Sequence, residues 1–247
     1  MRATAFVAAL MLSMPGSAAA QEWDLYVNIQ DGFQINFPGQ PTVTQTTWKS
    51  QLNYKLPARV YSASRGPERY SLTVVDYSSL EQQGIERAKT CEPGNANCRA
   101  NAGIIGPGYW RQDERGAILY ATFKLLQRDA KLTELGWEWQ DMVEGHFLQL
   151  TNADQSRTFA YVGMHQRKLY VLEGTVPKGH PEPGLFQQSM GWVDKDGNTI
   201  RYQQIIYSNA DHGLGVYPVP RYPLPGQGQG QEPGAGAGPA APAAGGR

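Results

Sequence analysis

The chain has 247 residues, of which 22 are Lys or Arg and 22 are Asp or Glu, so its formal net charge is zero. A balanced charge offers no basic field to the phosphates of a nucleic acid, and the sequence has no acidic run that would attract a cationic partner. We therefore expect no nucleic-acid partner, and charge alone names no other partner.

Residues 1–20 are typical of a secretory signal peptide. Arg2 precedes the apolar run 5–14, and small residues end at Ala20. The apolar run is shorter than the roughly 20 residues that span a bilayer. We expect cleavage between Ala20 and Gln21, which leaves no transmembrane segment in the mature chain. The sequence thus predicts a periplasmic or secreted protein, with an uncleaved anchor as the alternative.

The mature chain opens with strand patterns. Residues 23–41 predict a β-hairpin, because apolar and polar residues alternate on both sides of the turn pair Asp31-Gly32. Further strands are expected over residues 43–48, 59–64 and 70–76. Hairpin connections of this kind favour antiparallel pairing.

The pattern changes after Ser79, where residues 80–89 predict a helix with Ser79 as its N-cap. Cys91 and Cys98 follow, separated by the turn-favouring sequence EPGNAN. In an exported chain, two cysteines at this spacing predict a small structural disulfide loop.

Residues 114–127 predict a second helix, because Leu119, Phe123 and Leu126 recur at helical spacing. Part of this segment also alternates well enough to form a strand, so a strand is the alternative. Gly116 weakens the helical pattern.

Strand patterns then return over residues 132–139 and 144–150, and Trp137 and Trp139 should share one face because they are two residues apart. Residues 157–176 predict the clearest hairpin, with the polar turn His165-Gln166-Arg167 between its arms. A short helix carrying Leu185, Phe186 and Met190 and a last strand over residues 200–207 should complete the fold.

These elements predict one α+β domain over residues 21–217, built on a single, largely antiparallel sheet that a few helices cover. Residues 218–247 are rich in Pro, Gly, Ala and Gln and have little to bury, so they predict a disordered tail. A spacer or a sticky arm is the alternative role for this tail.

Scattered motifs resemble the PsbP-like fold group. They are the stretch Tyr26…Asp31-Gly32-Phe33-Gln34-Ile35-Asn36-Phe37-Pro38 and the later Leu169-Tyr170, Pro177 and Phe186-x-x-Ser189. That group includes the extrinsic protein of photosystem II, a nuclear-import factor that binds Ran, and bacterial envelope proteins. The resemblance implies an α-β-α sandwich that binds or assists other proteins, and it implies no site residue here.

The sequence contains no catalytic signature. None of the four histidines, His146, His165, His180 and His212, has the spacing of a metal motif, and we expect exposed or capping roles for them. Ser189 lacks the context of a nucleophile elbow and should end a helix. The run 194–198 imitates a calcium loop but lacks its required Gly and Glu, so it predicts a turn.

No catalytic, cofactor-binding or metal-binding residue is therefore assigned, and no cofactor is expected. The first functional hypothesis is a non-enzymatic binding or assembly module for an unknown protein or small molecule in the cell envelope. The alternative is a hydrolase or metal-dependent enzyme whose site gathers dispersed residues, such as His146 and Glu144. One or two tryptophans at a sheet edge would suit a contact surface.

Overall fold

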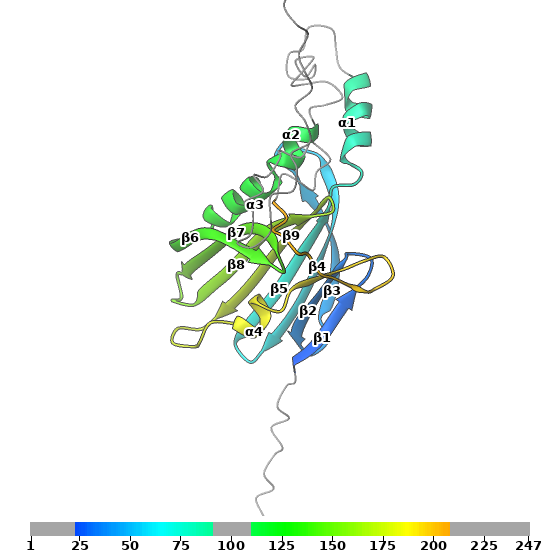
Figure 1. Ribbon diagram of the computed structural model, residues 1–247. Helices are drawn as coiled ribbons and strands as arrows, with labels where there is room; N and C mark the ends of the chain where they lie inside the picture. Colours follow the sequence, from blue (N-terminus) through cyan, green and yellow to red (C-terminus); the bar gives the residue numbers. More distant parts are fainter. Residues whose placement is uncertain (1–22, 91–109, 208–247) are drawn as a thin grey trace, which may run out of the picture. The chain divides into compact units, whose positions relative to one another are not determined.

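The computed structural model describes residues 23–90 and 110–207, which form two antiparallel sheets and four short helices (Figure 1). The larger sheet has the strand order β3-β4-β5-β9-β8-β7-β6, and the smaller has the order β1-β2-β10-β11. The prediction of a largely antiparallel fold with few helices is confirmed. The prediction of a single sheet is wrong, since the opening hairpin joins β10 and β11 in a sheet of its own.

Most strand bounds lie close to the predicted ones. The strands are β1 (Trp23–Asn28), β2 (Phe33–Pro38), β3 (Thr42–Lys49), β4 (Lys55–Arg65), β5 (Glu68–Asp76), β6 (Ala130–Gln140), β7 (Val143–Asn152), β8 (Arg157–His165), β9 (Lys168–Val176), β10 (Gly191–Val193) and β11 (Thr199–Ile200). The turn between β8 and β9 needs positive φ at both central residues, which Gln166 and Arg167 adopt at 46° and 60°.

The two faces of the larger sheet bury different clusters, because successive side chains along a strand point to opposite faces. Leu148, Ala160 and Val162 pack with the helices on one face. Leu72 and Tyr170 pack with the smaller sheet on the other. Each buried Leu or Val contributes about 1.5–3 kcal/mol, so the larger sheet is held from both sides.

The helices are α1 (Leu80–Lys89), α2 (Trp110–Arg115), α3 (Ala117–Leu126) and α4 (Gly184–Gln187). The first predicted helix is confirmed, although the Ser79 side chain makes no capping hydrogen bond. Gly84 lets α1 meet α2 closely, because a Cβ there would lie 2.9 Å from the Trp110 ring.

The second predicted helix is also confirmed as helical, but it consists of α2 and α3, which separate at Gly116. Its buried face does not contain the residues whose spacing indicated the helix. Ala121 and Leu125 are buried, whereas Leu119, Phe123 and Leu126 are exposed.

A buried carboxylate fastens the smaller sheet to the larger one. Asp31, in the β1–β2 turn, is fully buried and accepts hydrogen bonds from Arg59 and Tyr61 of β4. The Tyr170 hydroxyl donates to the Asp31 carbonyl at 2.6 Å. Burial and the Asp31 carboxylate raise the pKa of Tyr61, and Asp31 raises that of Arg59. The turn is thus locked to the sheet by charge-assisted bonds.

The segment after β11 departs from the predicted last strand. Residues 200–207 do not form one strand; Ile206 instead makes a single parallel bridge to Val143, where β7 extends beyond β8. α4 is also shorter than predicted, with Phe186 buried and Leu185 exposed. In the part of the chain described here, no helix has the length and apolar character needed to cross a membrane.

Several predictions concern residues outside the described ranges. They are the signal peptide with its cleavage at Ala20 and Gln21, the Cys91–Cys98 disulfide, His212 and the tail 218–247. The extent of the single domain and the export of the chain also stay predictions.

Candidate protein-contact surface

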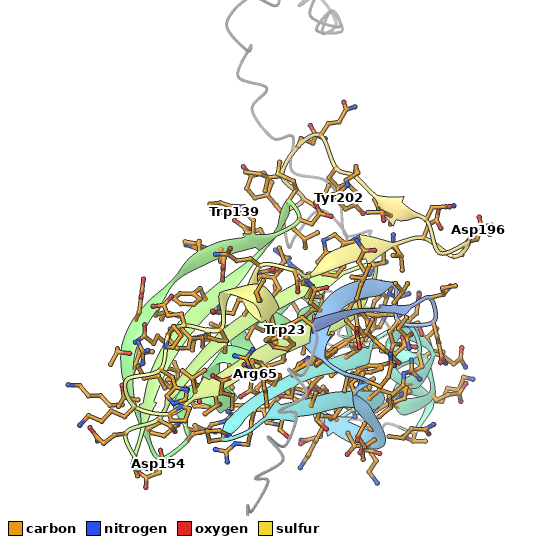
Figure 2. All side chains as sticks on the ribbon, turned by 90° about the horizontal axis from the view of Figure 1, so that it is seen from below. Trp23, Arg65, Trp139, Asp154, Asp196 and Tyr202 are labelled. Atoms are coloured by element: carbon orange, nitrogen blue, oxygen red, sulfur yellow. The ribbon has the colours of Figure 1, made fainter. Side chains whose placement is uncertain are left out.

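Seven large apolar side chains remain exposed on α3 and β6, and we call them the α3–β6 surface. They are Leu119, Phe123 and Leu126 of α3 and Leu132, Leu135, Trp137 and Trp139 of β6. Leu119 is 67% exposed and Trp137 is 63% exposed. Figure 2 shows Trp139 at the margin of the larger sheet. Single exposed apolar residues are ordinary, but a group of this size on adjoining elements is typical of an interaction site.

The strand register places the β6 residues on the helix-covered face. Leu135 pairs with Leu148, and Leu148 belongs to the core beneath α3. Trp137 and Trp139 follow at alternate positions, opposite His146 and Glu144. The prediction that the two tryptophans share a face is therefore confirmed. They stay exposed because β6 is an edge strand that α3 does not reach across.

Leu119, Phe123 and Leu126 lie on a side of α3 that the sheet does not cover. Another side of the helix carries Tyr120 and Lys124, which contact Trp48 of β3 at the opposite edge of the sheet. Thr122 hydrogen-bonds His146 Nδ1 at 2.8 Å. The His146 ring in turn meets the Trp137 ring edge-on, with 4.8 Å between the ring centroids. The helix and the edge strand therefore contact the same histidine, which links the two parts of the α3–β6 surface.

His146 adds to this apolar surface because its ring carries no charge at neutral pH. Burial lowers the pKa of His146, so the imidazole is neutral at pH 7. A neutral ring packed on Trp137 adds apolar area and no charge.

The other face of β6 is charged. Lys131, Glu134 and Glu138 point there, opposite Thr151, Gln149 and Gly145 of β7. Burial, and then the neighbouring Glu134, raise the pKa of Glu138. One carboxylate oxygen of Glu138 is buried and has no hydrogen-bond partner within residues 23–90 and 110–207. An unsatisfied carboxylate beside a like charge is unfavourable, and a cation would relieve it.

The enzyme hypothesis named Glu144 and His146, and the described ranges bring no third metal-binding side chain to them. Glu144 and His146 share a face of β7, but His146 bonds Thr122 and the Glu144 amide bonds the Ile206 carbonyl. Within the described ranges, no group of three His, Cys, Asp or Glu side chains is close enough to hold a metal ion.

The other singled-out residues serve the fold. The expected exposed role is wrong for His165, which is 1% exposed, packs on Trp192 at 4.3 Å and hydrogen-bonds Tyr202 through Nε2. The fold buries it because Trp192 of β10 and Tyr202, which follows β11, pack against its ring. His180 is partly exposed, and its Nδ1 atom lies 3.2 Å from Oε1 of Glu68.

Two predicted turn or end residues are confirmed. Ser189 follows α4, donates to the Phe186 carbonyl and accepts from the Asn36 amide at 2.9 Å. Asp194 accepts the amides of Asp196 and Asn198 in the β10–β11 turn, and these bonds lower its pKa.

Two adjacent buried carboxylates in α2 form no joint site. Asp113 accepts from the Ser50 hydroxyl and from the Leu52 amide at 3.1 Å, and burial raises its pKa. Glu114 accepts from Arg167 at 3.1 Å, in the β8–β9 turn. Each carboxylate ties α2 to a different part of the sheet, which gives them a structural role.

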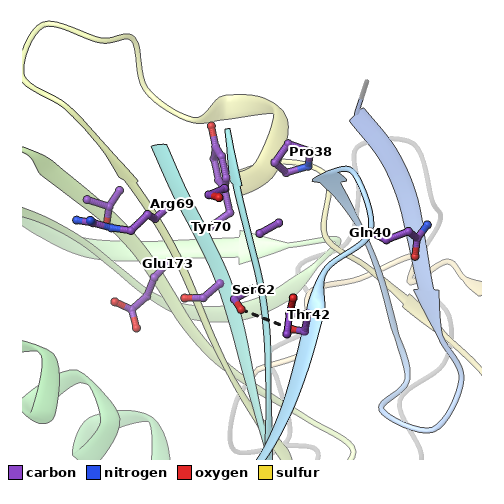
Figure 3. A pocket seen from close by; sticks show the side chains of 11 residues that line it. Pro38, Gln40, Thr42, Ser62, Arg69, Tyr70 and Glu173 are labelled. Atoms are coloured by element: carbon purple, nitrogen blue, oxygen red, sulfur yellow. Dashed lines mark hydrogen bonds between the residues drawn. The ribbon is translucent and has the colours of Figure 1, made fainter. Parts of the chain in front are cut away.

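A polar depression of about 610 Å³ lies over β4, β5 and β9 (Figure 3). Hydroxyl-bearing residues line much of it, together with Arg69 and Glu173. Arg128, after α3, holds Glu173 in an ion pair. The carboxylate in the lining, Glu173, is thus already paired, and the depression suits a small polar molecule.

Comparison with known proteins gives a likeness at the level of structure. No family model matches the chain, and no curated protein matches it. The fold matches the solution structure of cyanobacterial PsbP (CyanoP) from Synechocystis sp. PCC 6803, with 12% identity and a TM-score of 0.39. The match covers 74% of this chain and 99% of that chain. That protein belongs to the fold group that the sequence resembles, and at this level of likeness the match supports no further argument.

The sequence predicts that Trp137 and Trp139 share a face, but it does not identify the rest of this surface. Its pattern assigns Leu132 and Leu135 only to a strand. The segment AILYATFKLL is apolar on nearly every side, so its spacing does not show which side the sheet covers. The position of β6 at the edge of the sheet is what leaves its apolar residues exposed.

Proposed function

We propose that this protein is a contact module that binds an extended β-strand of a partner protein at the β6 edge. The observation that carries this proposal is the α3–β6 surface, with seven exposed apolar side chains. Four of them belong to β6, which within residues 23–90 and 110–207 has a neighbouring strand on only one side. A strand added to a free edge gains main-chain hydrogen bonds, and the side chains next to that edge select the partner.

The surface has the composition of a binding site. Tryptophan is enriched among the residues that contribute most to protein interfaces, and here Trp137 and Trp139 stand next to each other on one face. The neutral His146, which lies opposite Trp137 on β7, adds no charge to this area. The incoming strand should therefore carry large apolar side chains at alternate positions.

Export of the chain, which residues 1–20 predict, would place this contact in the cell envelope. A photo-reactive amino acid at position 139 should then cross-link one partner. Leu185 in α4 is the matched control because, like Trp139, it is a large exposed apolar residue, but it lies on another element. Cross-links obtained equally at both positions would argue against a specific surface.

The decisive measurement uses the identified partner in purified form. Trp137→Ala with Trp139→Ala should weaken its binding by about tenfold or more, because two central aromatic anchors are removed. The control Leu185→Ala should bind as the parent chain does. Unchanged binding of the double variant would exclude the α3–β6 surface as the contact.

A further inference from the structure

The free edge of β6 has a pattern that is complementary to itself. A register shift between Leu132 and Glu134 makes Thr133 and Glu134 share one position opposite Gln149. Counting that pair as one position, large apolar residues occupy every second position from Leu132 to Trp139. Leu132, Leu135, Trp137 and Trp139 occupy one face, and Lys131, Glu134, Gly136 and Glu138 occupy the other.

We propose that β6 pairs antiparallel with β6 of a second copy of this chain, about a two-fold axis at Leu135. This inference rests on the proposed function, because it names the strand that the free edge receives. The larger sheets of the two copies would join into one continuous sheet, which is the isologous arrangement of a two-fold dimer.

The apolar face fits in this register. Leu135 lies opposite its own symmetry mate, and Leu132 lies opposite Trp137 of the second copy. Both pairs lie on the face of the α3–β6 surface. Directly opposed aromatic and aliphatic side chains stabilise antiparallel strands. Gly136 lies opposite the bulged pair, and a Cβ at Gly136 would meet nothing within 4 Å, so the position is open.

The charged face fits as well. The register places Lys131 of one copy opposite Glu138 of the other, twice across the axis. Glu138 has a buried oxygen without a hydrogen-bond partner in the described ranges, and Lys131 has no ion pair there. Pairing would supply the missing cation to Glu138 and the missing anion to Lys131.

Neighbouring registers are less favourable. An axis one position later, at Gly136, would place the Thr133–Glu134 pair opposite Glu138 of the other copy. An axis one position earlier would place Glu134 opposite Glu134. Like charges directly opposite each other destabilise paired strands, so charge selects the axis at Leu135.

The register is tested first by cysteine cross-linking of the purified protein. Directly opposed residues of antiparallel strands have Cα atoms about 4.5–5.5 Å apart, within the range of a disulfide. Leu135→Cys should therefore form a covalent dimer under mild oxidation, with the new bond located by peptide mapping.

Leu132→Cys is the matched control, because its own mate would lie about four residues away along the strand, roughly 13 Å. It should not cross-link to itself but should cross-link to Trp137→Cys when the two variants are mixed. Cross-linking of Leu132→Cys to itself, or failure of Leu135→Cys, would overturn the register.

Charge reversal tests the pairs without changing the apolar face. Lys131→Glu or Glu138→Lys alone should weaken dimerisation by on the order of tenfold, since each creates two like-charge contacts. The double variant restores opposite charges and should recover most of the affinity. Sedimentation equilibrium measures the dissociation constant, and circular dichroism verifies the fold of each variant.

Two results would overturn the dimer. One is a parent chain that stays monomeric up to about 100 µM, which is far above the nanomolar to micromolar range of specific complexes. The other is a double variant as weak as the single ones. If the chain is monomeric but Trp137→Ala with Trp139→Ala still loses a different partner, the dimer fails and the contact function stands.

Discussion

The two edge strands of the larger sheet, β3 and β6, have opposite characters. β3 has the sequence TVTQTTWK, with four threonines, and most of its exposed side chains are polar. Its large aromatic residue, Trp48, is covered by Tyr120 and Lys124 of α3. β6 has the sequence AKLTELGWEWQ, and its leucines and tryptophans remain exposed.

An edge strand invites pairing with other chains, and proteins usually protect it with charge, proline or a covering element. Polar residues and the packed Trp48 make β3 a poor receptor for another apolar strand. β6 has a bulge but keeps an apolar face and an unsatisfied carboxylate. β6 is thus better suited than β3 to receive another strand, and we call β6 the open edge of the sheet and β3 the closed edge.

Removal of the Asp31 carboxylate, near the closed edge, should have the largest effect on stability. Asp31 anchors the smaller sheet to β4, next to β3, so Asp31→Ala leaves Arg59 and Tyr61 without their buried acceptor. Breaking a buried charge pair by removing one partner costs about 3–5 kcal/mol. Urea denaturation should show that the free energy of unfolding falls by this amount.

Asp196→Ala is the control for Asp31, because Asp196 is an exposed aspartate paired with Lys195. Its effect should stay within about 0.5 kcal/mol. Equal effects at the two positions would mean that the smaller sheet is not held by Asp31.

A lysine introduced in β6 or in β3 tests whether the two edges differ in their ability to pair. Leu135→Lys would bring two like charges together at the proposed axis, and dimerisation should weaken by about thirtyfold or more. Thr44→Lys in β3 should leave the dissociation constant unchanged. Sedimentation equilibrium distinguishes the outcomes, and equal weakening by both substitutions would show that the edges do not differ.

The strands of this fold could be predicted from the sequence because local patterns determine them. Alternation and tight-turn pairs, such as Asp31-Gly32, identified the hairpins without knowledge of the rest of the molecule. The arrangement of the hairpins could not be predicted in the same way. β2 joins β10, more than 150 positions further along the chain, and this pairing produces the second sheet.

The candidate surface was predictable only in part for the same reason. The spacing of Trp137 and Trp139 showed that they share a face, but not whether a helix covers that face. His165 shows the converse, since a polar residue in a predicted turn became buried when Tyr202 and Trp192 packed on it. Exposure depends on which elements meet, and sequence periodicity does not encode that.

Acidification should weaken the pairing of the open edge, because Glu138 lies on that strand. Burial and Glu134 raise the pKa of Glu138 in the single chain, whereas Lys131 of the second copy would lower it in the dimer. Dimer formation then releases protons, so association strengthens as pH rises through that window. The dissociation constant should be about three- to tenfold larger at pH 4 than at pH 7. Glu138→Gln should remove this dependence, and a parent chain with a flat profile would contradict the ion pair.

The smallest effect concerns His146, where α3 meets the open edge. Burial lowers the pKa of His146, so between that value and about 6.5 the unfolded chain binds the proton that the folded chain excludes. The free energy of unfolding should therefore rise with pH across this window and level off above it. His146→Gln retains a group that can bond Thr122 but does not titrate, so its stability should depend less on pH. The difference between the two chains, measured by urea denaturation at pH 5 and pH 8, cancels the shared contributions of Asp113 and Glu138. A difference that is the same at both pH values would show that His146 titrates as freely as in the unfolded chain, and hence that α3 and β6 do not enclose it.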